Sequence, residues 1–294
     1  DFSTTSGIIN WHAGGYWNPG GGVSVRLSYQ SGRRAPNIAE LFAGGPSGFD
    51  TFQDPCADLS PFDSSTLADN CRSNGPLGVP DGFTQSQSPV DIQSFGNPNL
   101  SEERSSNLTW GLSLDSDGLF DHFPGRFRLS VDTYRIKVSN YIVNLDADQL
   151  LDVCYRSEGL TNIFCGDNPV TGSPYIQRDP STGNLLAATG TIFNAGKFWL
   201  KGYDVELQYL LDLKGQDSFI DGVTVSGLYS RNLDARQQNS ADGPVEELRG
   251  LPKYPKHRLQ AGVSFDMGNV TVDWDARIRG SATSHLAFTA LPEA

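Results

Sequence analysis

Polar and apolar residues alternate along several short segments of the chain. In the clearest of them, 22–30, every second residue from Val23 to Tyr29 is apolar and the residues between are polar. Successive side chains of a β-strand point to opposite faces, so such a segment predicts a strand with one apolar and one polar face. The pattern predicts strands at about 7–17, 22–30, 105–114, 126–142, 197–211, 222–232, 257–265 and 270–279. The expected fold class is therefore all-β, with antiparallel strands.

The connections between these predicted strands alternate between short and long. The short ones are 18–21, 115–125, 212–221 and 266–269, and the long ones are 31–104, 143–196 and about 233–256. Because consecutive antiparallel strands run in opposite directions, all the long connections leave the same end of the sheet. Short periplasmic turns and long extracellular loops are typical of outer-membrane β-barrels. A soluble sandwich has no reason for this asymmetry, and a lipocalin-like barrel shows it only in part.

The fourth predicted strand changes its alternation part-way along. Phe127, Leu129 and Val131 are apolar at odd positions, whereas the later apolar residues, from Tyr134 to Val138, are at even positions. The change indicates either a β-bulge or the level at which the strand leaves the lipid, beyond which its outer face need not be apolar. The residues alone leave both interpretations open.

Composition excludes some classes of function. The chain has 22 basic and 34 acidic residues and a formal net charge of −12, which disfavours nucleic acid as a partner. No run approaches the roughly 18 apolar residues of a membrane-spanning helix, and the first residues show no secretion signal. Barrel strands are only half apolar, so neither observation argues against a membrane protein.

The 4 cysteines fall into two local pairs, each inside a predicted long loop. Cys56 and Cys71 lie in the first loop, and Cys154 and Cys165 lie in the second. Their even number and close spacing indicate two disulfides, and hence an oxidising compartment such as the periplasm or the cell surface. A metal site is the alternative, but neither pair has Cys-x-x-Cys spacing and no histidine accompanies them.

The sequence contains no catalytic motif. Its 4 histidines are scattered, and the usual nucleophile, zinc-hydrolase and phosphate-loop motifs are absent. The glycine run 20–22 joins two predicted strands, so it indicates a turn. We therefore expect no enzymatic activity, no metal and no cofactor.

Four motifs resemble those of the TonB-dependent outer-membrane receptor family. The first two flank the longest loop and comprise Arg34, Ala35, Pro36, Glu40, Leu41 and Phe42, and then Asn97, Pro98, Leu100 and Glu103. The other two resemble the family's Asp-x-Tyr-x-Ile and Gly-x-Asp/Glu-x-Glu strands and comprise Asp132, Tyr134 and Ile136, and then Gly202, Asp204 and Glu206. Where the family usually has a proline before the glutamate of the second motif, this chain has Glu102. The matches follow the family's order and spacing over roughly residues 20–210.

The resemblance implies a transmembrane β-barrel of roughly 22 strands, of which this chain supplies about eight. It also implies active uptake of a scarce nutrient across the outer membrane of a Gram-negative bacterium. The implied partners are outer-membrane lipid, TonB with ExbB–ExbD, and an extracellular siderophore, saccharide, peptide or cobalamin. A passive porin-like channel or a surface adhesin on a smaller barrel is the alternative function. A secreted β-sandwich binding module is a third reading.

The predicted strand order also orients the chain. The first turn falls on the periplasmic side, so residues 1 and 294 both fall on the extracellular side. Complete outer-membrane barrels begin and end on the periplasmic side. We therefore expect residues 1–294 to be a partial receptor barrel, without the plug domain through which TonB acts.

The predicted extracellular loops are the expected sites of ligand contact, because loops on a rigid scaffold carry recognition. The candidate ligand-binding residues are Arg33, Arg34, Phe49, Phe52, Phe83, Tyr155 and Tyr175. Their aromatic rings could stack on a ligand or pack on one another within the loops. The two arginines could attract an anionic ligand, although pairing with Glu40 or with local carbonyls is the favoured interpretation.

Overall fold

The computed structural model describes residues 7–44, 47–50, 52–86, 90–120, 124–145, 147–215, 218–239 and 245–283. Eight long strands form a wall, and shorter elements lie in the connections between them. The long strands are β1 (Trp11–Gly20), β2 (Val23–Arg34), β5 (Glu103–Asp115), β6 (Arg126–Asn144), β8 (Leu185–Asp212), β9 (Gly222–Gln238), β11 (His257–Met267) and β12 (Val270–Arg279). The connections contain α1 (Ile38–Phe42), β3 (Ser47–Asp50), α2 (Thr66–Cys71), β4 (Val90–Phe95), α3 (Ser116–Leu119), α4 (Ala147–Tyr155), η1 (Glu158–Leu160), η2 (Ile163–Cys165), β7 (Ile176–Arg178) and β10 (Val245–Glu247).

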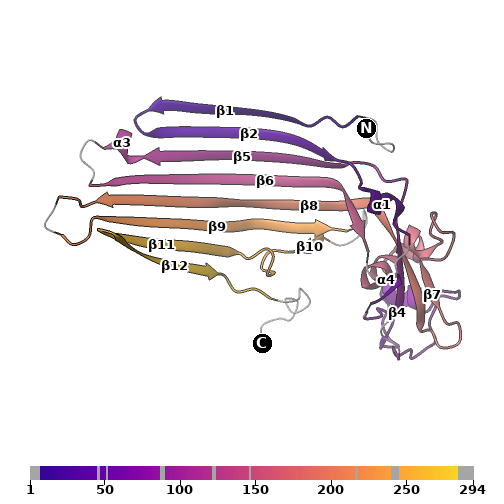
Figure 1. Ribbon diagram of the computed structural model, residues 1–294. Helices are drawn as coiled ribbons and strands as arrows, with labels where there is room; N and C mark the ends of the chain where they lie inside the picture. Colours follow the sequence, from indigo (N-terminus) through magenta and orange to yellow (C-terminus); the bar gives the residue numbers. More distant parts are fainter. Residues whose placement is uncertain are drawn as a thin grey trace.

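Each long strand of the wall pairs with the next long strand, and every such pairing is antiparallel. Figure 1 shows the resulting single layer, in the order β1-β2-β5-β6-β8-β9-β11-β12. The predicted all-β class and the eight predicted strands are confirmed. β8 is longer than predicted, since it begins at Leu185 and not near residue 197. Its first part leaves the wall and pairs with β4 and β7, where the alternation that marks a half-buried strand does not hold.

One face of the wall, here called the outward face, carries an apolar belt. Paired residues in one row across β2 to β12 are Val25, Leu112, Val131, Val205, Tyr229, Leu259 and Ile278. Belt side chains stay exposed, with 54% of Leu27 and 60% of Trp274 accessible, and no described element packs over them. Leaving such a face in water costs about 25 cal/mol for each Å² of apolar surface, and an exposed belt of this width is suited to an apolar surrounding. The β-sandwich reading required a second sheet on this face.

The change of alternation in β6 is explained by the strand pairing. The register of β6 against both neighbours runs without a shift from Arg126 to Ser139. Arg135 and Lys137 therefore lie on the outward face, in line with the belt residues before them. Of the two interpretations left open by the sequence, the strand leaves the apolar belt here, and a bulge follows only at Asn140, where φ is +56°.

All the short connections lie at one end of the wall and all the long ones at the other, as predicted (Figure 1). The turn between β1 and β2 consists of Gly21 and Gly22, slightly later than predicted, because pairing continues to Gly20. The two turn residues have φ of +62° and +71°, a conformation that glycine adopts without steric strain. No helix in the described part of the chain is long and apolar enough to cross a bilayer.

The two longest connections fold together at the loop end of the wall into what we call the cap, which includes α2, α4, β4 and β7 (Figure 1). The main buried cluster of the described residues lies in the cap, with Leu150, Leu151 and Tyr155 of α4 fully buried at its centre. Both predicted disulfides are confirmed, namely Cys56–Cys71 and Cys154–Cys165, and each lies in the cap. The cap is thus a small packed unit and not a set of loose loops.

Candidate functional site

The junction between the wall and the cap is held by Arg34, the last residue of β2. Its Nε donates a hydrogen bond of 2.6 Å to Glu103 Oε2, and its two terminal nitrogens donate bonds of 3.0 Å to the two oxygens of Glu40. This forked geometry suits a guanidinium and a carboxylate better than any lysine contact. The pairing of Arg34 with Glu40, favoured from the sequence, is present.

Glu40 also fixes the start of helix α1. Its backbone N–H donates to Asn37 Oδ1 at 2.8 Å, while its own carboxylate accepts from the backbone N–H of Asn37 at 2.7 Å. This reciprocal arrangement is a capping box. Burial alone would raise the pKa of Glu40, but the hydrogen bonds from Arg34 and from the Asn37 N–H hold the pKa below its usual value. Glu40 therefore stays ionised and keeps its hydrogen bonds with Arg34 and Asn37.

The second motif closes the same junction from the other side. Glu103 Oε1 accepts from the backbone N–H of Ile142 at 2.9 Å, so this one carboxylate ties β2 to β6. Asn194 accepts from the N–H of Ser101 at 2.8 Å and donates to the carbonyls of Ser101 and Asn140, both at 2.9 Å. The first two motifs, distant in sequence, thus join at the loop end of the wall. We call the residues Arg34, Glu40 and Glu103 the clamp. Sequence reasoning missed Ile142, which contributes only a backbone N–H, and Asn140, which contributes its carbonyl and a side-chain amide that donates to Ser101 Oγ at 3.1 Å.

The remaining residues of these two motifs pack beneath the clamp or lie at its rim. Leu41, Leu100 and Ile142 form a small apolar cluster. The Asn97 N–H donates to the Glu40 carbonyl at 2.8 Å, which joins the second motif to α1. The other four residues of the two motifs differ in exposure. Pro36 is buried, Ala35 is half-buried, and Phe42 and Pro98 are exposed.

The third and fourth motifs lie side by side on the face of the wall opposite the apolar belt, here called the inward face. Asp132 is opposite Asp204 in the register, and Tyr134 is opposite Gly202. A Cβ on Gly202 would approach Tyr134 Oη to 2.4 Å, so the glycine makes room for the ring. The hydroxyl of Tyr134 then donates to Asn232 Oδ1 on β9 at 3.0 Å.

A second glycine leaves the space in which an ion pair crosses β5. Arg26 of β2 donates from Nε to Asp132 Oδ1 of β6 at 2.7 Å, although β5 separates the two strands. The residue between them is Gly111, where a Cβ would lie 2.1 Å from that carboxylate oxygen. The inward face is therefore a polar wall cross-linked between strands, which suits a wet lumen. Ile136 and Glu206 lie on this same face.

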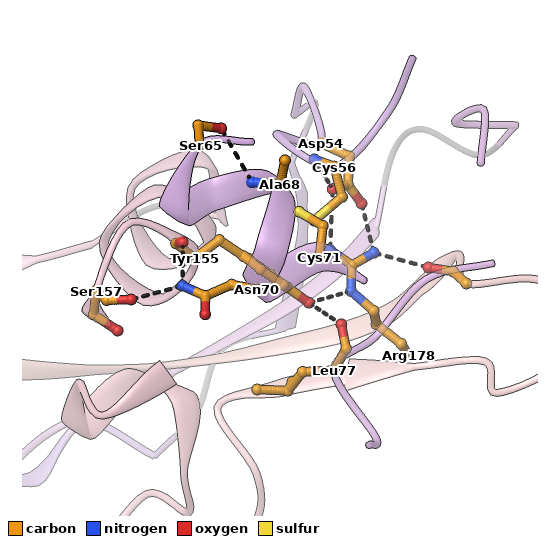
Figure 2. Close-up of a disulfide and its surroundings, with 11 residues drawn as sticks. Asp54, Cys56, Ser65, Ala68, Asn70, Cys71, Leu77, Tyr155, Ser157 and Arg178 are labelled. Atoms are coloured by element: carbon orange, nitrogen blue, oxygen red, sulfur yellow. Dashed lines mark hydrogen bonds and ion pairs between the residues drawn. A yellow bond between two sulfur atoms is a disulfide. The ribbon is translucent and has the colours of Figure 1, made fainter. Parts of the chain in front are cut away.

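The centre of the cap contains a buried ion pair (Figure 2). Arg178 of β7 donates to both oxygens of Asp54, at 2.6 and 3.0 Å, and both side chains have no exposed surface. Its Nε donates to Tyr155 Oη at 2.7 Å, and a terminal nitrogen donates to the Gly183 carbonyl at 2.8 Å. Charges buried in this way are tolerated only when paired and hydrogen-bonded, and here both conditions hold.

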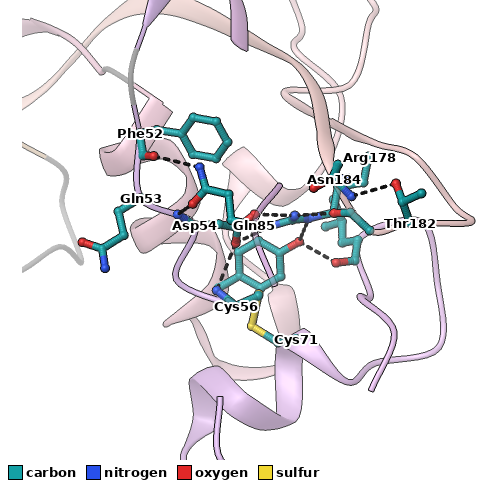
Figure 3. Close-up of polar contacts among 12 residues, drawn as sticks. Phe52, Gln53, Asp54, Cys56, Cys71, Gln85, Arg178, Thr182 and Asn184 are labelled. Carbon is teal, nitrogen blue, oxygen red and sulfur yellow. Dashed lines mark hydrogen bonds and ion pairs between the residues drawn. A yellow bond between two sulfur atoms is a disulfide. The ribbon is translucent and has the colours of Figure 1, made fainter. Parts of the chain in front are cut away.

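Further hydrogen bonds join the ion pair to the rest of the cap (Figure 3). The backbone N–H of Asp54 donates to Gln85 Oε1 and Gln85 donates to the Phe52 carbonyl, both at 2.9 Å. The N–H of Cys56 donates to Asp54 Oδ1 at 3.0 Å, next to the first disulfide. Separately, Asn70 of α2 donates to the carbonyl of Tyr155 at 2.8 Å (Figure 2).

The surface of the cap contains a cleft of about 880 Å³. It is bordered by α2 and α4, by Asn239 after β9 and by Glu246 of β10, and most of the residues that line it are polar. The polar lining residues include Gln53, Asp63, Thr66, Asp148, Asp152, Asn239 and Glu246. The volume lies within the range of sites for small-molecule ligands. No group of three or more potential metal ligands occurs among the described residues.

A family profile described as TonB dependent receptor-like, beta-barrel, matches residues 1–289. The chain belongs to the TonB-dependent receptor family. Members of this family are receptors of the outer membrane of Gram-negative bacteria, not enzymes. The family predicted from the sequence is thereby confirmed. No curated protein matches the chain.

Several solved receptor structures are similar to this chain. A variant of the ferric enterobactin receptor PfeA of Pseudomonas aeruginosa, in complex with enterobactin, has 15% identity over 92% of this chain and 28% of its own, with a TM-score of 0.49. The siderophore receptor PirA of Acinetobacter baumannii has 12% identity over 93% of this chain and 30% of its own, with a TM-score of 0.47. The hemophore receptor HasR of Serratia marcescens, with its hemophore HasA and heme, has 14% identity over 92% and 31%, with a TM-score of 0.44. The chain thus spans about a third or less of the length of these receptors.

The residues predicted to bind ligand lie in two places in this receptor chain. Phe52, Phe83, Tyr155 and Tyr175 are all buried in the core of the cap. Their burial favours the alternative that loop aromatics pack on one another, and ligand contact by them stays a prediction. Arg34 belongs to the clamp, and Arg33 is exposed, 3.2 Å from Glu102. The side chain of Phe49 lies outside the described residues.

Proposed function

We propose that this chain forms part of the wall and the ligand-capturing cap of an outer-membrane receptor that imports a nutrient with energy from TonB. The observation that carries the proposal is the cap itself. A disulfide-linked unit with its own core and a cleft is attached to the loop end of a barrel wall that belongs to the receptor family. A pore that only lets solutes pass has no need of such a unit.

The inner wall supports the same proposal. Its polar contacts link strands that are not neighbours, since the contact of Arg26 with Asp132 and that of Tyr134 with Asn232 each cross one intervening strand. A polar lumen can hold a plug domain and, once the plug moves, admit a hydrophilic solute. TonB, driven through ExbB–ExbD, would act on that plug and not on the residues of this chain.

The cleft is the proposed site of first capture. Most of its lining residues carry carboxylate, amide or hydroxyl groups, and one of them, Arg156, is a cation. Such a lining favours a ligand rich in hydroxyl and amide groups, as in a saccharide, a peptide or a siderophore. The clamp of Arg34, Glu40 and Glu103 would keep the cap, and therefore the cleft, in place over the lumen.

The test is uptake by cells that carry the gene, compared with cells in which it is deleted. Labelled ferric siderophores, oligosaccharides, peptides and cobalamin are supplied at limiting concentration, with and without functional TonB. Thr66→Trp, which places a ring in the cleft, is expected to reduce uptake of the cargo at least about tenfold. Asn74→Trp, on an exposed part of the cap away from the cleft lining, is the matched control and is expected to leave uptake unchanged. Uptake that continues without TonB would support the passive channel instead.

A further inference from the structure

Basic residues gather on the outward face of the wall, just past the apolar belt on the side of the long loops. On β6, Arg135 and Lys137 continue the outward positions of Leu129 and Val131. Lys201 and Trp199 of β8 lie opposite them, and Lys197 follows on the same face. We call this surface the basic band, and its residues are Arg33, Arg104, Arg135, Lys137, Lys197, Lys201, Arg231 and Arg236.

The basic band contrasts with the whole chain, whose formal net charge is −12. Two acidic residues partly neutralise its margins. Glu102 is 3.2 Å from Arg33 and 3.0 Å from Arg104, and Asp234 is 2.7 Å from Arg236.

At the centre of the band one acidic residue is near, since Asp234 lies opposite Lys201 in the strand pairing while it forms its ion pair with Arg236. Within the described part of the chain, no ion pair joins Arg135, Lys137, Lys197, Lys201 or Arg231 to a carboxylate. All five are exposed. A group of five cations that form no ion pair repel one another, so together they favour binding of an anion.

A groove of about 320 Å³ lies within the band, across β5, β6 and β8. Three cations line it, namely Arg104, Lys137 and Lys197, together with the ring of Trp199. The other side chains of the lining are small, since they are Ser31, Ser105, Ser106, Val138 and Ser139, and no carboxylate is among them. Serines leave space between the cations and offer hydroxyl donors, so the groove suits a phosphate-sized anion with several oxygen acceptors.

The position of the groove decides which anion it meets. Val131 lies in the belt and Lys137 in the groove, and six residues of strand separate them by about 20 Å. Between these levels the outward rows pass through Trp110 and Tyr203, aromatic side chains of the kind that lie at a membrane interface. An amphiphile whose chains cover the belt would therefore have its headgroup at the level of the cations.

We propose that the groove binds the phosphate-bearing headgroup of a lipid in the leaflet nearest the long loops, with its acyl chains lying along the apolar belt. The proposal rests on the membrane location inherent in the proposed function, but it does not depend on the cargo. Lysines that face lipid are costly unless an anion pairs with them, and the headgroup supplies that anion. The phosphates in turn meet two lysines together with Arg104, which also pairs with Glu102.

The test measures lipid binding by the intact receptor purified in detergent, with native mass spectrometry as the readout. The probes are a diphosphorylated glycolipid and the same glycolipid after removal of its phosphates. The double variant Lys137→Gln with Lys197→Gln is expected to weaken binding of the phosphorylated form about 30-fold, which is about 2 kcal/mol at 1.4 kcal/mol per tenfold. The control Lys214→Gln with Lys253→Gln removes two charges outside the band and is expected to bind as the wild type does.

Two results would overturn the proposal. One is equal binding by the groove variant and the wild type, and the other is equal binding of the two glycolipids, which would show attachment through acyl chains alone. Ser106→Glu places a carboxylate in the groove and is an independent variant that should weaken binding at least as much. Compact mobility on an unheated gel shows that each variant is folded. Nutrient uptake, measured in parallel, separates failure of this proposal from failure of the transport function.

Discussion

Replacing Arg178 by methionine should strongly destabilise the cap while leaving the barrel wall intact. The change removes the two hydrogen bonds to Asp54 and those to Tyr155 and Gly183, and it leaves the carboxylate of Asp54 buried without a counter-charge. Breaking a fully buried pair on one side costs about 3–5 kcal/mol. A unit as small as the cap is stable by only about 5–15 kcal/mol, so the loss is a large part of its free energy of unfolding.

The measurement is hydrogen exchange of the α4 amides in the folded receptor, because exchange reports local opening that gel mobility of the barrel does not detect. The loss of about 3 kcal/mol or more should appear as exchange at least about 100-fold faster. The matched control is Arg156→Met, which breaks the exposed pair with Asp152 and should cost about 0.5 kcal/mol or less. A double variant, Asp54→Asn with Arg178→Met, removes both charges and should be more stable than the sum of the two single changes predicts. Equal effects of Arg178→Met and Arg156→Met, or strict additivity in the double variant, would refute the reasoning.

Three further changes test other parts of the structure. Gly202→Ala should lower the barrel's unfolding free energy in urea by about 1–3 kcal/mol, because the added Cβ meets Tyr134 and a backbone carbonyl. The control Gly227→Ala adds its Cβ in open space and should be nearly neutral. Equal urea midpoints for the two variants would contradict this reasoning. Replacing Cys154 and Cys165 by serine should destabilise the cap by about 3 kcal/mol in hydrogen exchange, with the wall unaffected; unchanged cap protection would contradict it. Burial raises the pKa of Tyr175 to about 12, so the folded cap holds this proton more tightly than the unfolded chain does. Cap stability should therefore be unaffected by this group below about pH 10 and fall between about pH 10 and 12, and Tyr175→Phe should remove that part of the fall.

The wall could be predicted from the sequence because its signal is local. In 22–30 and 270–279 the alternation of side chains directly reports which face of the strand is apolar, and the short turns mark the strand ends. The alternation gives no such information where a strand extends beyond the apolar belt. It therefore left β6 ambiguous, and it placed the start of β8 too late.

The cap could be predicted only in part, because its structure depends on contacts between distant residues. The two disulfides were accessible, since each joins cysteines close in sequence. The pairing of Asp54 with Arg178 joins residues separated by 124 positions, and no spacing rule reveals such a pair. The burial of Tyr155 and Tyr175 follows from the same packing, so loop aromatics that looked suited to ligand contact lie in the core.

The most direct test of the central claim is the environment of single spin labels on neighbouring residues of the wall in a reconstituted bilayer. Labels at Leu112 and Val131, on the outward face, should be accessible to oxygen dissolved in the lipid and shielded from a water-soluble nickel chelate. Labels at Ser113 and Ser130, one position away on the inward face, should show the reverse. Outward labels that are shielded from both reagents, or labels whose preferences do not alternate from one residue to the next, would contradict a lipid-facing belt and with it the assignment of this chain as a receptor wall.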